Sequence, residues 1–554
     1  MAKNSLSQFL TRRTPQREAI PGVPQMQNHA GGFVFAVDEW TRLRRFLILG
    51  IDGPTYYVAE QQLVKENAEA LLVCISLDGK RTVDEIVAIS VAGRNPKQQP
   101  IVFALAACAA AQDPATRAYA LGALNKVCRT GTQLFLFAGY VEQFRGWGRG
   151  LRRAIGNWYL NRDADALALQ LVKYQQRDGW SHRDLLRLAK PQPELNGATD
   201  LALRWAVGKS TAESVASGPE LIRAFEAAKI AQTPAESATL ITAHRLPWEA
   251  VKSEHLRSPD VWNTLIPTMG MGALVRNLGR LTENGTLTAN SQALEQLLTR
   301  LSDADAIRSA RLHPISVLSA MLTYQNGGGV RGKLAWAPIA SVVDALDEAF
   351  YASFGSVEPA GKRTLLALDV SGSMGAGLLA GVPGLTPKLA SAAMAAVTLA
   401  TEPHVETVAF TCTGQQQWQP SNSGRKNQHN QTSGITPLAL SKRQRLDDIV
   451  RTVSGLPFFG TDCALPMLYA IDKNLGVDQF VIYTDSETWA GEVHPMQALQ
   501  RYRERSGIAA KLTVVAMTST GFSLADPRDA GMLDVVGFDT AAPQLIADFA
   551  AGRL

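Results

Sequence analysis

The sequence predicts two parts, an α-helical repeat domain followed by an α/β domain with a mainly parallel sheet. Three observations predict this fold. Helical periodicity, with little strand-like alternation, continues from residue 38 to about residue 352. After Tyr351, apolar strand-like runs alternate with helical patterns. The first of these runs ends in Asp369-Val370-Ser371-Gly372-Ser373, which predicts a ligand-binding loop at the carboxyl end of a buried strand.

Length and composition set the outer limits. A chain of 554 residues is too long for one hydrophobic core unless repeats extend it. With 46% hydrophobic and 19% charged residues, the chain has the composition of a globular protein. The five cysteines show no close spacing, which argues against a disulfide framework or a zinc site and favours a reducing cytoplasm. We expect no secretory signal and no membrane span, because the most apolar run, 101–111, is too short.

The N-terminal part is expected to consist almost entirely of short helices. Residues 1–30 are polar, contain three prolines and are expected to form a flexible leader. Beyond them, apolar residues recur at intervals of three and four, as in Leu43, Phe46 and Leu47. Many short helices in series favour stacked antiparallel pairs, so residues 31–360 are predicted to form a HEAT-like repeat domain. Typical predicted helices are 38–49, 64–77, 82–92, 101–112, 114–127, 149–159, 163–175 and 182–188.

The C-terminal part, residues 361–554, has the order of a βαβ series. The predicted strands are 365–369, 407–412, 480–485 and 512–517. The predicted helices are 388–401, 446–453, 463–474 and 495–503. Residues 415–432 are rich in Gln, Asn and Ser and are expected to form a mobile insertion.

Five side chains from three segments predict a magnesium site. Asp369, Ser371 and Ser373 offer one carboxylate and two hydroxyls, which suit a hard cation but form only half of an octahedral site. Thr461, in a glycine-marked loop, and Asp485, after a second apolar strand, can supply the rest. The ordered set resembles the metal-ion-dependent adhesion site of von Willebrand factor A domains, which have a Rossmann-like α/β fold. The alternative is a helix-capping aspartate followed by ordinary loop serines.

Basic residues concentrate in one stretch of the helical part. Residues 126–190 hold 12 Lys and Arg against five Asp and Glu, so they are a candidate phosphate-binding surface. Helical spacing places three groups of cations on common faces, namely Arg149 with Arg152 and Arg153, Lys173 with Arg177, and Arg183 with Arg187 and Lys190. The alternative is a solvated helix face whose cations pair with Asp178 and Asp184.

Aromatic residues accompany the basic stretch. Trp147, Trp158 and Tyr159 could stack on bases, although at helical spacing a core position is favoured. His182 is expected to cap or pack rather than to catalyse.

Further motifs in the helical part resemble the TROVE domain, which is found in telomerase, Ro and vault proteins. They lie at 44–50, 53–57, 147–155, 179–188, 276–279 and 331–334. Coupled to an A domain, they identify the chain as resembling the Ro autoantigen family, in its bacterial branch. The resemblance implies that the repeats close into a ring, with the A domain helping to seal it. It also implies that the outer rim binds the stem of Y RNA and that a central hole accepts single-stranded 3′ ends of misfolded RNAs.

The same resemblance implies partners and contact residues. Bacterial relatives are implied to hand RNA to an exoribonuclease, polynucleotide phosphorylase, with Y RNA as the tether, in RNA quality control and stress survival. Lys173, Arg177 and the neighbourhood of Arg187 map onto the Y RNA contact of the family, and Lys190 stands where vertebrate members have histidine. The candidate RNA contacts are Arg129, Arg149, Arg152, Arg153, Lys173, Arg177, His182, Arg187 and Lys190.

Three functions are therefore compared. No zinc-protease, Walker, nucleophile-elbow or nuclease-like motif occurs in the sequence. The favoured hypothesis is a noncatalytic, cytoplasmic and monomeric RNA-binding protein that carries Mg²⁺ and binds no membrane. The second is a magnesium-dependent protein-interaction scaffold, and the third is a metallo-hydrolase, which lacks a general base beside the single metal.

Overall fold

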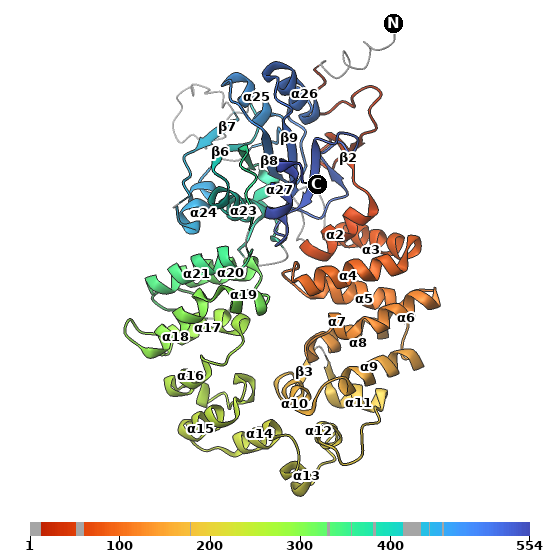
Figure 1. Cartoon of the computed structure of the whole chain (residues 1–554), viewed down its shortest axis with the longest axis vertical. Helices are drawn as coiled ribbons and strands as arrows, with labels where there is room; N and C mark the ends of the chain where they lie inside the picture. The colour runs from red at the N-terminus through yellow and green to blue at the C-terminus, as the bar shows by residue number, and fades with distance from the viewer. Residues whose placement is uncertain are drawn as a thin grey trace, which may run out of the picture. The chain divides into compact units, whose positions relative to one another are not determined.

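The computed structural model describes residues 13–50, 60–177, 179–329, 333–355, 357–379, 384–413, 434–442, 444–456 and 459–553, with the backbone alone for 60–67. These residues form two compact units (Figure 1). The first combines Met1–Ala70 with Phe354–Leu554 and is called the sheet unit here; the second, Leu71–Ser353, is called the helical unit.

The helical unit is a series of short helices in which neighbours along the chain pack on one another (Figure 1). Helix α3 (Glu60–Leu77) crosses the boundary between the units. The first half contains α4 (Gly79–Ala92), α5 (Gln99–Ala110), α6 (Pro114–Gly122), α7 (Leu124–Val127), α8 (Gly131–Phe144), α9 (Arg149–Leu160), α10 (Ala164–Lys173) and α11 (His182–Ala189). The second half contains α12 (Ala198–Ala206), α13 (Ala212–Ala216), α14 (Glu220–Ile230), α15 (Pro234–His244), η1 (Trp248–Ala250), η2 (His255–Arg257), α16 (Pro259–Leu265), α17 (Met271–Glu283), α18 (Gln292–Ser302), α19 (Ala304–Ser309), α20 (Pro314–Gln325) and α21 (Ala340–Ala352).

Side-chain caps explain where many of these helices begin. Asp113 and Asp163 accept hydrogen bonds from the first-turn amides of α6 and α10, and Thr130 and Gln133 form a capping box on α8. One expected helix, 114–127, is divided into α6 and α7. The division falls directly after Gly122, a residue type that weakens a helix interior.

The sheet unit is built on a six-stranded sheet of order β11-β9-β8-β5-β6-β7. The strands β5 (Arg363–Asp369), β6 (His404–Phe410), β8 (Gln479–Thr484), β9 (Lys511–Ala516) and β11 (Met532–Val536) are parallel, and β7 (Ile435–Leu438) is antiparallel at the edge. The helices are α22 (Gly372–Gly375), α23 (Pro387–Thr401), α24 (Leu446–Ser454), α25 (Leu465–Asp472), α26 (Pro495–Ser506) and α27 (Ala542–Ala551). The mainly parallel βαβ order is confirmed, whereas β7, β11 and α27 were not expected.

Within the sheet unit, the N-terminal segment packs on the α/β domain. Strands β1 (Met26–Gln27), β2 (Phe33–Ala36) and β10 (Phe522–Ser523) form a small antiparallel sheet. Helix α2 (Glu39–Leu49) carries Arg45, whose buried guanidinium pairs with Asp534 on β11 at 2.7 Å. The expectation of a flexible leader is therefore wrong for residues 13–30, because their polar groups bond to loops of the α/β domain.

The predicted fold class, helical repeats followed by an α/β domain, agrees with both units. Closure of the repeats into a ring stays a prediction. The expected insertion at 415–432 lies outside the described residues. Among the described residues, no helix combines the length and the apolar character that a membrane span requires.

Candidate functional site

Four of the five predicted metal ligands lie at or just after the carboxyl ends of two central strands, and the fifth, Thr461, lies in the segment between α24 and α25. Asp369 ends β5, and Asp485 follows β8, which pairs with β5 in parallel. Ser371 is the N-cap of the short helix α22 and Ser373 lies in its first turn, while the amide of Gly372 donates a hydrogen bond to the carbonyl of Phe459, two residues before Thr461. All five side chains are buried: Asp369, Ser371, Ser373, Thr461 and Asp485.

Hydrogen bonds bring four of these side chains together. Asp369 accepts from the amide of Ser371 at 2.9 Å and from the hydroxyl of Thr484 at 2.6 Å. The hydroxyls of Ser371 and Ser373 lie 3.3 Å apart, and Ser373 also bonds to the Asp485 carboxyl. The short Asp-x-Ser-x-Ser spacing thus produces one connected set of oxygen atoms.

The two carboxyls are held in a low-dielectric setting. Burial raises the pKa of Asp369 to about 6. Burial also raises the pKa of Asp485 well above its ordinary value, and the nearby charges of Asp369 and Glu487 raise it further. Two carboxylates brought together in this way are stabilised by a cation.

The residues present fit a hard divalent cation. The Thr461 hydroxyl and the Asp485 Oδ2 atom are buried and have no hydrogen-bond partner among the residues that the structure describes. Buried polar atoms without partners are rare and need an explanation, such as an ion or a water molecule. The described residues contain no group of three or more His, Cys, Asp or Glu side chains suited to a metal. The candidate site is not a cluster of that kind, because three of its five ligands are hydroxyl groups and only two are carboxylates.

The second candidate region is the exposed face of α9. This helix buries Leu151, Ile155 and Trp158 against its neighbours. Its opposite face exposes Arg149, Arg152 and Arg153, and none of the three guanidiniums pairs with a described residue. The predicted i, i+3, i+4 arrangement of exposed cations is therefore present on the surface.

Helix α11, which packs on α9, also exposes basic residues. Arg183 and Arg187 on the helix and Lys190 at its left-handed C-cap are exposed, whereas His182, Leu185 and Leu186 are buried. Asp184, one of the proposed acidic partners, is instead held by the backbone amide and hydroxyl of Ser181 at 3.0 and 2.5 Å. The other, Asp178, lies outside the described residues.

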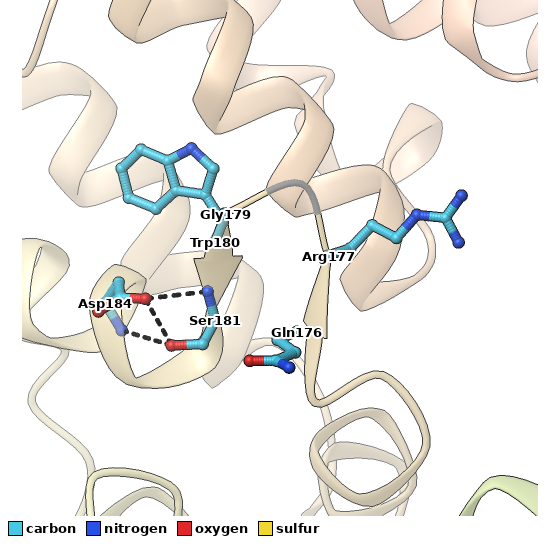
Figure 2. A pocket seen from close by; sticks show the side chains of 6 residues that line it. All are labelled: Gln176, Arg177, Gly179, Trp180, Ser181 and Asp184. Carbon is cyan, nitrogen blue, oxygen red and sulfur yellow. Dashed lines mark hydrogen bonds between the residues drawn. The ribbon is translucent and has the colours of Figure 1, made fainter.

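A pocket of about 400 Å³ lies beside this helix (Figure 2). Its lining residues come from the hairpin of β3 (Gln176–Arg177) and β4 (Trp180–Ser181) and from the start of α11. Figure 2 shows the Arg177 side chain extending away from Asp184 and the indole of Trp180 on the other side of the hairpin. Trp180 also packs on Trp147, with ring centroids 5.6 Å apart.

Two further predicted RNA contacts, Lys173 and Arg129, interact with neighbouring residues, unlike the arginine row of α9. Lys173 ends α10, with its ammonium 5.5 Å from the ring centroid of Tyr174. Arg129 is half-buried and donates to the Ser90 hydroxyl and to the Lys126 carbonyl, at 3.1 and 2.8 Å. Burial lowers the pKa of Arg129. Arg129 thus supports the local fold as well as adding positive charge.

His182 is wrong as a surface contact, because it is 3% exposed. Its ring faces the Tyr159 hydroxyl at 2.9 Å and the Gln170 carbonyl at 3.2 Å. Since a carbonyl can only accept, Nε2 carries the proton and Nδ1 accepts from Tyr159. Burial lowers the pKa of His182 to about 4. The expectation that His182 packs is confirmed, and Trp158 and Tyr159 are core residues as favoured.

Comparisons with known proteins match both regions. The TROVE domain model matches residues 26–218 and 243–326, and the model of the Ro60 vWA domain matches residues 363–550. A protein named RNA-binding protein RO60 from Deinococcus radiodurans is 42% identical over 554 residues, covering both chains completely. The chain belongs to the Ro60 family. The Caenorhabditis elegans protein of the same name is 34% identical over 620 aligned positions, covering 98% of this chain and 92% of that one.

A solved structure agrees with the Ro60 assignment. The crystal structure of the Deinococcus radiodurans RO (RSR) protein matches with a TM-score of 0.66 and 40% identity, covering 93% of this chain and all of that one. In this Ro60-family chain, the candidate metal ligands fall within the vWA match and the basic helices within the TROVE match.

Sequence reasoning missed several residues around the metal site. Thr484 bonds to Asp369, and its place directly before Asp485 was a usable signal. Gln16 and Asn28 contact the two loops from the N-terminal segment, more than 400 positions away. No spacing in the sequence indicates that contact.

Proposed function

We propose that the chain is a noncatalytic RNA-binding protein that holds RNA on the exposed basic surface of α9, α11 and the β3–β4 hairpin. Membership of the Ro60 family supports this proposal, because two relatives carry the name RNA-binding protein RO60. The single observation that carries it is the exposed row of Arg149, Arg152 and Arg153, whose guanidiniums lack partners among the described residues.

Unpaired guanidiniums suit a polyanion. Elsewhere in the helical unit, exposed basic residues form ion pairs, such as Lys229 with Glu226 and Arg308 with Asp305. On α9 the planar donor forks remain available for phosphate oxygens. Contacts of this kind neutralise phosphates, so they add affinity that falls with salt and carries no base specificity.

The RNA is proposed to be of two kinds. A Y RNA stem binds the basic surface, and single-stranded 3′ ends of misfolded or structured RNAs enter a central hole. The protein then presents these RNAs to an exoribonuclease such as polynucleotide phosphorylase, in quality control and stress survival. The motifs shared with the Ro family support these assignments. The five free, buried cysteines are consistent with action in the cytoplasm.

The sheet unit is proposed to add a magnesium-dependent docking point. Asp369, Ser371, Ser373, Thr461 and Asp485 would hold Mg²⁺, which offers a Lewis-acidic position to an oxygen of a partner. The unpartnered Thr461 hydroxyl and Asp485 Oδ2 support this assignment. The same observation favours a second candidate function, a magnesium-dependent protein-interaction scaffold in which RNA is not the main ligand.

Salt-dependent RNA binding tests the proposal. A structured RNA with a single-stranded 3′ tail is titrated with the full chain across a salt series, with a blunt RNA of the same stem as the comparison. A steep fall of affinity with salt is expected for both RNAs, with tighter binding of the tailed one. Affinity indifferent to salt and to the tail would favour the scaffold. Shortening of the RNA by the purified protein with Mg²⁺ alone would refute the noncatalytic role.

A further inference from the structure

The residues 14–33, called the strap here, lie against the two loops that carry Thr461 and Asp485. Gln16 in the strap is fully buried. Its amide nitrogen donates to Asp462 Oδ1 at 2.7 Å and to the Val493 carbonyl at 2.8 Å. Its amide oxygen accepts a hydrogen bond from the Thr488 hydroxyl. One carboxamide thus links a neighbour of Thr461 to the loop that follows Asp485.

A second part of the strap holds the backbone after Asp485. Asn28 donates from Nδ2 to the carbonyls of Ser486 and Thr488, at 3.1 and 2.9 Å. Glu487 is fully buried and accepts from the amide of Ala30 at 3.0 Å, while its other oxygen lies 2.8 Å from His29 Nδ1. These contacts fix three successive residues beyond the metal ligand.

The strap approaches this loop closely. A Cβ atom built on Gly32 would lie 1.8 Å from the Thr488 carbonyl oxygen, so the strap could not occupy this position with any other residue. Direct hydrogen bonds also join the loops: the amides of Trp489 and Ala490 donate to the Thr461 carbonyl at 3.1 and 3.0 Å, and the Cys463 amide donates to the Thr488 hydroxyl at 3.1 Å. The strap therefore reinforces a junction that the loops also make directly.

We infer that the strap is a positioning element of the magnesium site, in which Gln16 and Asn28 set the spacing between Thr461 and Asp485. The two loops present unpartnered oxygens at Thr461 and Asp485, and the strap bonds to both loops without occupying those atoms. Partners outside the ligand shell commonly change metal affinity 10–100-fold by orienting the ligands. This inference rests on the proposed Mg²⁺ site.

Two glutamines of the strap provide a matched pair for a test in the full chain. Gln16→Ala removes the buried link, whereas Gln27→Ala removes an exposed amide whose bond within the described part of the chain is to the Gly31 carbonyl. Mg²⁺ binding is measured by calorimetry, and the melting temperature of the sheet unit is measured in EDTA and in saturating Mg²⁺. We expect Gln16→Ala to weaken Mg²⁺ binding about tenfold and Gln27→Ala to change it less than about twofold.

The melting data separate positioning from a merely structural role. A structural role lowers the melting temperature equally in EDTA and in Mg²⁺ and leaves the Mg²⁺ affinity unchanged, a result that would overturn the inference. A positioning role also reduces the rise in melting temperature that Mg²⁺ produces. If wild-type protein binds no Mg²⁺, the metal site and this inference both fail, whereas RNA binding is unaffected.

Hydrogen exchange of the wild-type chain gives a second test that needs no variant. Coupling between two binding events is reciprocal. If the bonded strap strengthens Mg²⁺ binding, bound Mg²⁺ must stabilise the bonded strap to the same extent. We expect Mg²⁺ to slow exchange at the amides of Gln16, Asn28 and Phe33, whose carbonyl partners are Gly491, Gly32 and Gln16. The Asp369→Ala chain should show no such change. Slower exchange confined to the ligand loops would refute the coupling.

Discussion

The basic face of the helical unit and the metal site of the sheet unit differ in how their functional groups are held. Arg149, Arg152 and Arg153 project into solvent from one helix, and their positions follow from helical spacing alone. Asp369 and Asp485 are buried and depend on loops from distant parts of the chain. The basic face can lose one arginine and still bind phosphates, whereas the buried metal site depends on every ligand.

Electrostatics explains the difference. Exposed cations remain solvated, so each phosphate contact contributes a small and salt-screened amount. The buried carboxyls have lost their water, which raises the pKa of Asp369 to about 6 until a cation is present. We therefore expect substitutions on the basic face to weaken RNA binding step by step, and substitution of a metal ligand to abolish Mg²⁺ binding.

The largest effect is expected for Asp369→Ala. Removing the central carboxylate should weaken Mg²⁺ binding by more than about 100-fold, since loss of an outer partner alone costs 10–100-fold. The increment in melting temperature that Mg²⁺ gives the wild-type sheet unit should disappear with it. Calorimetry and thermal unfolding in EDTA and Mg²⁺ measure both quantities.

The affinity of the same variant for structured RNA should stay within about twofold of wild type, because the phosphate contacts belong to the other region. Parallel losses of RNA and Mg²⁺ binding would show that the two regions do not act separately.

Acid should destabilise the helical unit through a group beneath its basic face. His182 has a pKa of about 4 when folded, against 6.5 for the free side chain, and Tyr159, Gln170 and Arg162 face its ring. Between these values the unfolded chain binds a proton that the folded chain does not, so stability falls as the pH drops from 6.5 to 4. The loss should reach about 3 kcal/mol at pH 4.

Hydrogen exchange at the amides of α11 across this pH range measures that loss. His182→Gln should be less stable at pH 7 and should lose the pH-dependent part. An unchanged pH dependence in His182→Gln would assign the effect to other groups.

The same contrast explains what the sequence could and could not predict. The strand that ends at Asp369, the strand that Asp485 follows and the arginine row of α9 were predicted because each depends on local pattern. His182 was listed among the candidate RNA contacts although it was expected to cap or pack, and its ring faces Phe135 and Tyr159. The strap was taken as flexible because polar, proline-containing segments usually are, and its long-range bonds through Gln16 leave no periodic trace.

A double substitution should give an intermediate effect on RNA. Lys173→Ala with Arg177→Ala removes one cation at the end of α10 and one that lines the pocket of the β3–β4 hairpin, and should weaken binding of a Y RNA stem about tenfold, or ~1.4 kcal/mol. The slope of log affinity against log salt should fall by about 2. Filter binding at several salt concentrations measures both.

Arg501→Ala with Arg505→Ala, on α26 of the sheet unit, removes the same charge and provides the control. A loss of similar size in the control would mean that net charge alone sets the affinity, and that the hairpin has no special role.

The smallest effect is expected for Arg183→Ala. Arg183 is exposed on α11 but stands beside Asp184, whose carboxylate is already engaged by Ser181, so the guanidinium contributes charge without a fixed geometry. We expect a loss of about twofold in stem affinity and a decrease of at most about 0.9 in the salt slope, the value for one phosphate contact. Arg187→Ala, one helical turn further along α11, should reduce stem affinity more than Arg183→Ala if the end of α11 lies nearer the RNA. Equal losses of tenfold or more at both positions would mean that α11 fits the RNA closely, and the graded character assigned to the basic face would then be wrong.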